Sequence, residues 1–170
     1  IGLHARAGTP NLFIKIPGTA EGLPAIEEAT FAGVPVNVTL LFSTAHYLAA
    51  AEAWLRGIER RLAARLSPDV VSVASLFVSR WDVAVAGKLP AELNMRLGIA
   101  IGQSAYKAYC DLLRSPRYLR VMNAGARPQR LLLAKRLLTD TGLPVTEVAL
   151  ASGFASVRRF GSSVVTRSAR

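Results

Sequence analysis

The sequence predicts an α/β protein with a parallel sheet, followed by a small all-α segment. In the first two thirds of the 170 residues, apolar β-branched strand patterns alternate with helical patterns three times. Because parallel neighbouring strands need a crossover connection, usually a helix, this alternation favours a parallel sheet. Beyond Pro128 the strand patterns stop and three short helical patterns follow. We therefore expect an α/β domain over residues 1–124 and a helical segment over residues 125–170.

The first strand–helix unit occupies the beginning of the chain. Residues 11–16 are a short apolar run that a Pro-Gly-Thr turn ends, which predicts a buried strand. Residues 21–31 carry apolar side chains at helical spacing, and Gly33 follows them. A helix is therefore expected after the first strand.

Two further units follow with the same order of patterns. The second has a strand over residues 36–42 and a long helix from about residue 44 to residue 65, which Pro68 separates from the third unit. The third has a strand over residues 70–78, then a loop, then a helix over about residues 91–113. After the Ser115-Pro116 dipeptide the pattern changes, and a first helix of the all-α segment is expected from Gln129 to Thr139.

Four polar residues interrupt the predicted strands. They are Lys15, Asn37, Thr39 and Ser75. Both faces of a parallel sheet are normally covered, so polar residues in its strands need a reason. If these side chains face the inside of a barrel they converge, and a buried lysine amine is neutral and nucleophilic near neutral pH. The alternative is that Lys15 ends an edge strand and its side chain reaches water.

Three sequence blocks resemble the transaldolase family. The run NLFIKIPGTAEGLPAI at residues 11–26 resembles the family's signature around its Schiff-base lysine, which falls on Lys15. The run GVPVNVTLLFS at residues 33–43 resembles the next strand, and SVASLFVSRWD at residues 72–82 resembles the strand after that. The matches continue through residues 98–109, and GARPQRLL at residues 125–132 resembles the start of the following strand.

This resemblance implies a partial (β/α) TIM-type barrel and a transferase of the pentose phosphate pathway. Such an enzyme moves a dihydroxyacetone unit from a ketose phosphate to an aldose phosphate and requires no organic cofactor or metal. The resemblance gives each polar residue a role: Lys15 forms the Schiff base, Asn37 hydrogen-bonds the donor, Thr39 positions a catalytic water, Ser75 binds a substrate hydroxyl and Arg80 clamps the phosphate.

The resemblance also implies that parts of the enzyme are missing. The family's acid/base carboxylates lie on strands before the lysine strand, and no acidic residue precedes Asn11 here. A closed eight-stranded barrel needs about 250 residues. We therefore expect a partial barrel of uncertain activity, with open sheet edges through which copies associate.

The basic excess of the chain lies near its end. Through Leu113 there are 10 Lys and Arg against 9 Asp and Glu, whereas from Arg114 on there are 11 against 2. Such asymmetry suggests a polyanionic partner or a solvated basic tail. The run RLLLAKRLLTDTGLPVTEVALASGFASVRRF at residues 130–160 also resembles the second helix-turn-helix of AraC-type regulators, most closely the form found in methylated-DNA repair regulators. That resemblance implies DNA contacts on the last helix, from Ser156, Arg158, Arg159 and Ser162.

Three readings of function remain open: a transaldolase-like enzyme, a DNA-binding transcriptional regulator, and a chimera of two unrelated gene pieces. The composition also bears on disulfide bonds, metal sites and membrane spans. Cys110 is the single cysteine, which excludes an internal disulfide and a multi-cysteine zinc site. The longest stretch without charge, residues 29–51, contains polar side chains and reads as strand plus helix. We see no targeting leader and expect a cytoplasmic protein without a membrane span.

Overall fold

The computed structural model describes residues 1–9, 11–93 and 96–133. Within them the chain divides into two compact units. The first unit contains Ile1–Leu76 and Ala108–Leu132, and the second contains Phe77–Lys107 together with Leu133. The first unit holds a sheet with its helices, and the second holds short helical segments.

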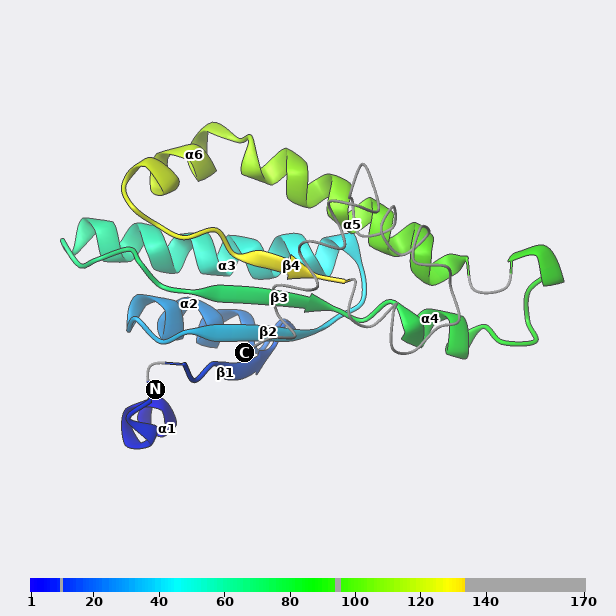
Figure 1. Cartoon of the computed structure of the whole chain (residues 1–170), viewed down its shortest axis with the longest axis horizontal. Helices are drawn as coiled ribbons and strands as arrows, with labels where there is room; N and C mark the ends of the chain where they lie inside the picture. The colour runs from blue at the N-terminus through cyan, green and yellow to red at the C-terminus, as the bar shows by residue number, and fades with distance from the viewer. Residues whose placement is uncertain (10, 94–95, 134–170) are drawn as a thin grey trace, which may run out of the picture. The chain divides into compact units, whose positions relative to one another are not determined.

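Four parallel strands in chain order form the sheet of the first unit (Figure 1). The predicted parallel α/β arrangement is therefore confirmed. Within this sheet the first and last strands are the outer ones. The strands are β1 (Ile14–Pro17), β2 (Val36–Leu41), β3 (Ser72–Leu76) and β4 (Arg130–Leu132).

The helices between the first three strands follow the predicted order. The side chain of Ser43 caps the long helix after β2 by accepting a hydrogen bond of 3.1 Å from the His46 N–H, which explains where that helix begins. In the first unit the helices are α1 (Gly2–Ala7), α2 (Leu23–Phe31), α3 (Thr44–Ala63), the last residues of α5 (Leu97–Leu113) and α6 (Pro116–Asn123).

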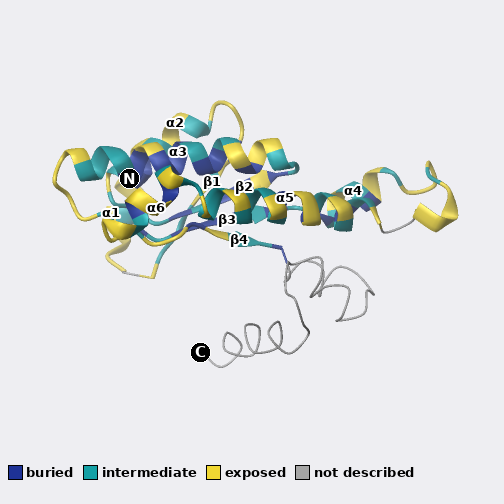
Figure 2. Ribbon diagram, turned by 90° about the horizontal axis from the view of Figure 1, so that it is seen from above, coloured by how far each residue is buried: buried dark blue, intermediate teal, exposed yellow. Residues whose placement is uncertain are grey.

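The core of the first unit lies between the sheet and its helices. Val36 and Val38 of β2 are fully buried, and so is Ala74 of β3, because alternate residues of a strand share one face. Trp54 and Ile58 of α3 are buried as well. Figure 2 shows buried residues along α3 and the strands. Burial of each large apolar side chain contributes roughly 1.5–3 kcal/mol.

Two elements near residue 120 differ from the prediction. The Ser115-Pro116 dipeptide starts α6, because the Ser115 side chain accepts a hydrogen bond of 3.3 Å from the Tyr118 N–H and Pro116 suits the first helical turn. The helix predicted from Gln129 is wrong over its first residues, which form β4 beside β3. Arginine and leucine favour helices by themselves, but strand pairing overrides that weak preference.

The second unit begins directly after β3. It contains α4 (Ser79–Ala84), the short 3-10 helix η1 (Ala91–Leu93) and the first turns of α5. The sequence predicts a loop where α4 lies and one helix over residues 91–113, where the structure has η1 and α5. A six-residue helix is too short for its periodicity to stand out from a loop.

Candidate functional site

Lys15 and Asn37 lie opposite each other on neighbouring strands. The register pairs Lys15 of β1 with Asn37 of β2, and Asn37 with Val73 of β3, so the three share one face of the sheet. Lys15 is exposed, so the predicted burial of its amine is wrong for this structure. The physical reason is its place on an outer strand, which has a neighbour on one side only. This is the edge-strand alternative that the sequence left open.

Asn37 and Ser75 make direct contact across β2 and β3. The Ser75 hydroxyl donates a hydrogen bond of 2.9 Å to Oδ1 of Asn37, and both side chains are half-buried. Ser75 lies two residues beyond Val73, the register partner of Asn37, and therefore on the same face. The hydrogen bond uses the Asn37 carbonyl oxygen as its acceptor, which leaves the two hydrogens of the Asn37 amide as possible donors to a ligand.

Thr39 is the most buried polar residue on this face. It is 4% exposed, and its hydroxyl has no hydrogen-bond partner among the described residues. Its backbone carbonyl accepts a hydrogen bond of 2.7 Å from the Gly18 N–H, which extends the pairing of β1 and β2 beyond Pro17. A buried hydroxyl without a partner costs free energy, so Thr39 is suited to hold a water or a substrate oxygen.

The backbone changes direction immediately after Thr39. Leu40 has a φ of 58°, a left-handed conformation that is unusual for a residue with a side chain. The pairing of β2 with β3 shifts register between Val38 and Leu41, so Leu40 sits in an irregularity of the bulge type. Such strain costs about 1–3 kcal/mol and often accompanies functional sites. No pattern in the sequence indicates a left-handed conformation at Leu40.

A tight turn follows the lysine strand. The Gly22 N–H donates a hydrogen bond of 2.9 Å to the Thr19 carbonyl. A Cβ atom added at Gly22 would lie 1.9 Å from the carbonyl oxygen of Pro17, which is closer than atoms of a folded protein approach. The glycine at this position of the block is therefore required by backbone packing.

Arg80 lies on α4 of the second unit and is exposed. Within that unit its guanidinium carbon lies 6.0 Å from the centre of the Phe77 ring, a cation–π arrangement. Of the five sequence-predicted substrate and catalytic residues, the four in the first unit lie on β1, β2 and β3, and Arg80 follows β3.

Asp82 is a residue of this region that the sequence did not single out. It is 8% exposed, and its Oδ1 accepts a hydrogen bond of 3.2 Å from the Gly98 N–H at the start of α5. The available sign was a glycine inside a helical pattern, since such a glycine often marks a close approach of backbones. An acidic residue two positions after Arg80 was the second sign.

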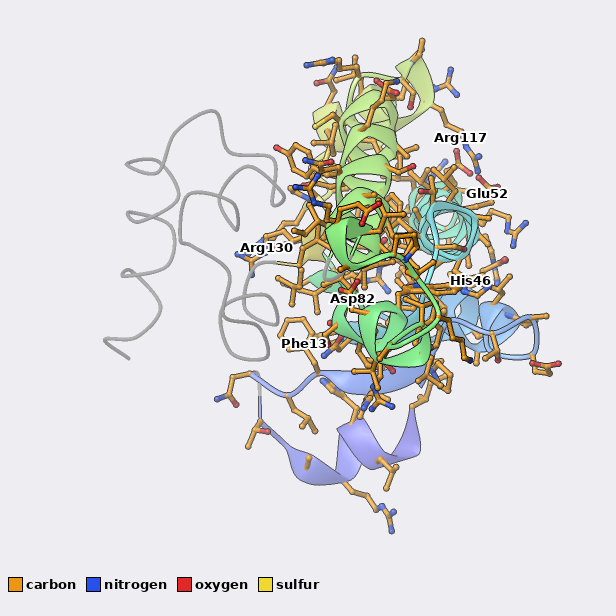
Figure 3. All side chains as sticks on the ribbon, turned by 90° about the vertical axis from the view of Figure 1, so that its right-hand side faces the viewer. Phe13, His46, Glu52, Asp82, Arg117 and Arg130 are labelled. Carbon is orange, nitrogen blue, oxygen red and sulfur yellow. The ribbon has the colours of Figure 1, made fainter. Side chains whose placement is uncertain are left out.

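One group of charged side chains in the first unit joins two helices. Arg117 of α6 donates hydrogen bonds of 2.7 Å to each oxygen of Glu59 and one of 2.6 Å to Glu52, both on α3. Figure 3 shows Arg117 and Glu52 directed toward each other. The hydrogen bonds from Arg117 lower the pKa of Glu59, and those carboxylates raise the pKa of Arg117. This cluster joins two helices.

Three tyrosines near the α3 helix hold their protons tightly. Burial raises the pKa of Tyr47 and Tyr118, and to a smaller extent that of Tyr109. The rings of Tyr47 and Tyr109 meet edge to face, with centres 6.2 Å apart. A phenol whose pKa is raised by burial is unsuited to proton transfer near neutral pH, and we assign Tyr47 and Tyr118 to the core.

Other kinds of site find little support in the described residues. Across residues 1–9, 11–93 and 96–133, no group of three or more His, Cys, Asp and Glu side chains is arranged to hold a metal ion. No helix in the same ranges is long and apolar enough to cross a membrane. The predicted DNA contacts Ser156, Arg158, Arg159 and Ser162 lie outside the described residues.

Comparison with known proteins gives one family. A sequence model of the transaldolase/fructose-6-phosphate aldolase family matches residues 2–142. The match runs past residue 125, where the sequence suggested the change to a DNA-binding segment. The comparisons lend no support to an AraC-type helix-turn-helix.

Individual relatives agree with the family match. The chain is 47% identical to a transaldolase of Parafrankia sp. over 145 residues, which is 81% of the chain and 39% of that relative. It is 43% identical to a transaldolase of Thermobifida fusca with the same coverage, and 41% identical to one of Renibacterium salmoninarum over 152 residues, 85% of the chain and 41% of the relative. The chain therefore spans about two fifths of the length of these relatives.

Proposed function

Because the chain belongs to the transaldolase/fructose-6-phosphate aldolase family, we propose that it carries the lysine-centred part of an enzyme that transfers a dihydroxyacetone unit between sugar phosphates. The four-stranded parallel sheet is consistent with part of the family's TIM barrel. The observation that carries the proposal is the placement of Lys15 opposite Asn37, with Asn37 hydrogen-bonded to Ser75 on the next strand. These residues lie in the sequence blocks that resemble the family.

The proposed chemistry starts at the exposed amine of Lys15. Its nitrogen attacks the ketose carbonyl carbon, and loss of water leaves a protonated imine. When the bond between C3 and C4 of the sugar breaks, its electron pair moves toward that imine and an aldose phosphate departs. The retained three-carbon unit then attacks an acceptor aldehyde, and hydrolysis of the new imine frees Lys15.

Neighbouring residues would bind and orient the sugar. The amide hydrogens of Asn37 are available for a sugar oxygen because the Ser75 hydroxyl already occupies its carbonyl oxygen. The buried Thr39 hydroxyl would hold the water needed for imine hydrolysis, and Arg80 would bind the phosphate group. None of the four described strands carries a carboxylate, and we assign no residue to the proton transfer that cleavage requires.

Borohydride trapping tests the proposal. Incubation with fructose 6-phosphate and borohydride should add the mass of the sugar phosphate less one oxygen atom, and peptide mapping should place the adduct on Lys15. If cleavage also occurs, the trapped group carries three carbons only, so the added mass separates imine formation from turnover.

The matched variants are Lys15→Arg, which should give no adduct, and Lys88→Arg, which removes another exposed lysine and should react like the parent. A parent chain that gains no mass, or an adduct that persists in Lys15→Arg, would contradict the proposal.

A further inference from the structure

The start of α5 contacts the short helix that carries Arg80 at Asp82 and contacts Val78 immediately before that helix, so the two contacts lie on either side of Arg80. We propose that Asp82 and Gly98 form a clamp that fixes α4 in the orientation in which Arg80 binds a phosphate group. Asp82 is then a positioning residue that acts through Arg80. The inference rests on the proposed function, because the phosphate is that of the sugar substrate.

The Asp82 carboxylate supplies the first half of the clamp. It is almost fully buried and accepts the hydrogen bond from the Gly98 N–H. Gly98 is the second residue of α5, and the N–H groups of a helix's first turn have no partner within the helix. A carboxylate at a helix N-terminus is also favoured by the helix dipole. Because burial of a charge is costly without such partners, the contact fixes where Asp82 lies.

The missing side chain of Gly98 supplies the second half. A Cβ atom at this position would lie 2.5 Å from Oδ2 of Asp82 and 2.6 Å from the carbonyl oxygen of Val78. Val78 precedes α4, and its carbonyl accepts a hydrogen bond of 3.3 Å from the Trp81 N–H. The backbone at Gly98 therefore lies close to residues 78 and 82, which stand on either side of Arg80 in the chain.

A helix as short as α4 needs such external support. It has six residues, and isolated helices of this length are not stable in water. The Phe77 ring, 6.0 Å from the guanidinium carbon, lies next to the Arg80 side chain, but that contact does not set the direction of the helix. Orientation matters for arginine because its planar fork binds a phosphate through two parallel hydrogen bonds.

The charge of Asp82 allows positioning to be separated from electrostatics. Asp82→Asn removes a negative charge two residues from Arg80, which by itself should strengthen anion binding. Loss of the clamp should weaken it, because the amide is a poorer acceptor at the start of α5. The two effects have opposite signs, so the direction of the change identifies the cause.

Calorimetric titration of the full chain with inorganic phosphate tests the proposal. We expect Asp82→Asn to weaken phosphate binding roughly tenfold, the equivalent of one charge-assisted hydrogen bond. Gly98→Ala keeps the charge but places a methyl group against Asp82 and Val78, and should weaken binding similarly. Glu92→Gln removes an exposed carboxylate from the same unit and should leave the affinity unchanged or slightly tighter. Arg80→Ala should abolish binding.

Three results would overturn the proposal: phosphate binding in Asp82→Asn as tight as in the parent or tighter, binding that survives Arg80→Ala, or no binding by the parent. If Asp82→Asn does not fold, as judged by its circular dichroism, Gly98→Ala decides the outcome alone.

Trapping on Lys15 distinguishes this proposal from the proposed function. With fructose 6-phosphate, Asp82→Asn should form less adduct than the parent, whereas with unphosphorylated fructose the two should form equal amounts. If Lys15 is never trapped but phosphate binding still depends on Arg80 and Asp82, the proposed function fails and the clamp remains. If trapping succeeds and shows equal losses with both sugars, Asp82 supports the fold in general and the clamp is wrong.

Discussion

Leu40, the residue after the buried Thr39, has a strained backbone conformation. Its left-handed φ of 58° and the register shift around it turn β2 so that Leu41 returns to the core and Leu40 stays partly exposed. A side chain with a second branch at Cβ tolerates this conformation worse than leucine does. The strain can therefore be tested by replacing Leu40 with a β-branched side chain of the same volume.

We expect the isomeric change Leu40→Ile to lower the free energy of unfolding by about 1 kcal/mol, because a β-branched residue at positive φ is more strained than leucine. Urea denaturation measures the difference. Leu48→Ile on α3, at a residue of similar exposure with ordinary helical backbone, serves as the control. Equal losses in the two variants would mean that Leu40 is not left-handed in solution.

The sequence predicted which side chains share a face of the sheet, but it did not predict how exposed each of them is. The alternation of strand residues was enough to put Asn37 and Ser75 on one face, and the structure joins them by a hydrogen bond. The exposure of Lys15 depends on which strand lies at the edge of the sheet, and local pattern does not contain the strand order. The roles of Lys15, Asn37, Thr39, Ser75 and Arg80 stay predictions.

Between elements, α6 is joined to α3 by Arg117, which bridges Glu52 and Glu59. The side chains of Arg117, Glu59 and Glu52 are 35%, 37% and 41% exposed, so the ion pairs are partly screened by water. Their geometry is nevertheless favourable, since two hydrogen bonds run in parallel from the guanidinium to Glu59. If these ion pairs stabilise the packing of α6 on α3, the stability of the chain should depend on pH, because the carboxylates lose their charge in acid.

The pKa of Glu59 is lower in the folded chain than its ordinary value of 4.5. The stabilisation from this group is therefore present above about pH 4.5 and is lost as the pH falls through the lower, folded value. We expect Arg117→Met to reduce the melting temperature at pH 7, and the difference from the parent to shrink progressively below pH 4.5. Thermal melts across this range, with the exposed Arg114→Met as control, measure it. A difference that is independent of pH would contradict the role of Glu59.

Elements with strong local patterns were predictable, and those decided by distant partners were not. The apolar spacing of α2 and α3 and the β-branched runs of β1, β2 and β3 specify these elements locally. By contrast, β4 forms because Arg130 and its neighbours pair with β3, more than 50 residues earlier in the chain. A Ser-Pro dipeptide can follow the end of one helix or begin the next, and at Ser115-Pro116 it begins α6, with Ser115 as the N-cap.

The chain as a whole carries a net charge of +10, with nearly all of the excess after residue 113. The resemblance of residues 130–160 to AraC-type regulators suggested sequence-specific DNA binding, and the comparisons do not support it. Charge alone still has a consequence, because a cluster of basic residues attracts any polyanion.

We expect the chain to bind duplex DNA weakly and without preference for sequence, and the affinity to fall steeply as the salt concentration rises from about 50 mM to about 200 mM. Mobility shifts on two unrelated duplexes and on heparin-blocked samples measure this. A clear preference for one duplex that Arg158→Ala removes would contradict the expectation, because it would show sequence-specific DNA recognition.

Gly22 and Lys15 lie seven residues apart in one sequence block, but different requirements constrain them. Backbone packing requires the glycine, whereas the proposed chemistry requires the lysine. Any side chain at Gly22 would collide with the Pro17 carbonyl, whereas the side chain of Lys15 is exposed on an outer strand. In a library selected for folding alone, the glycine should survive and the lysine should be replaced freely. A library selected for sugar chemistry should keep both, so the fate of the lysine distinguishes a working enzyme from a merely well-folded relative.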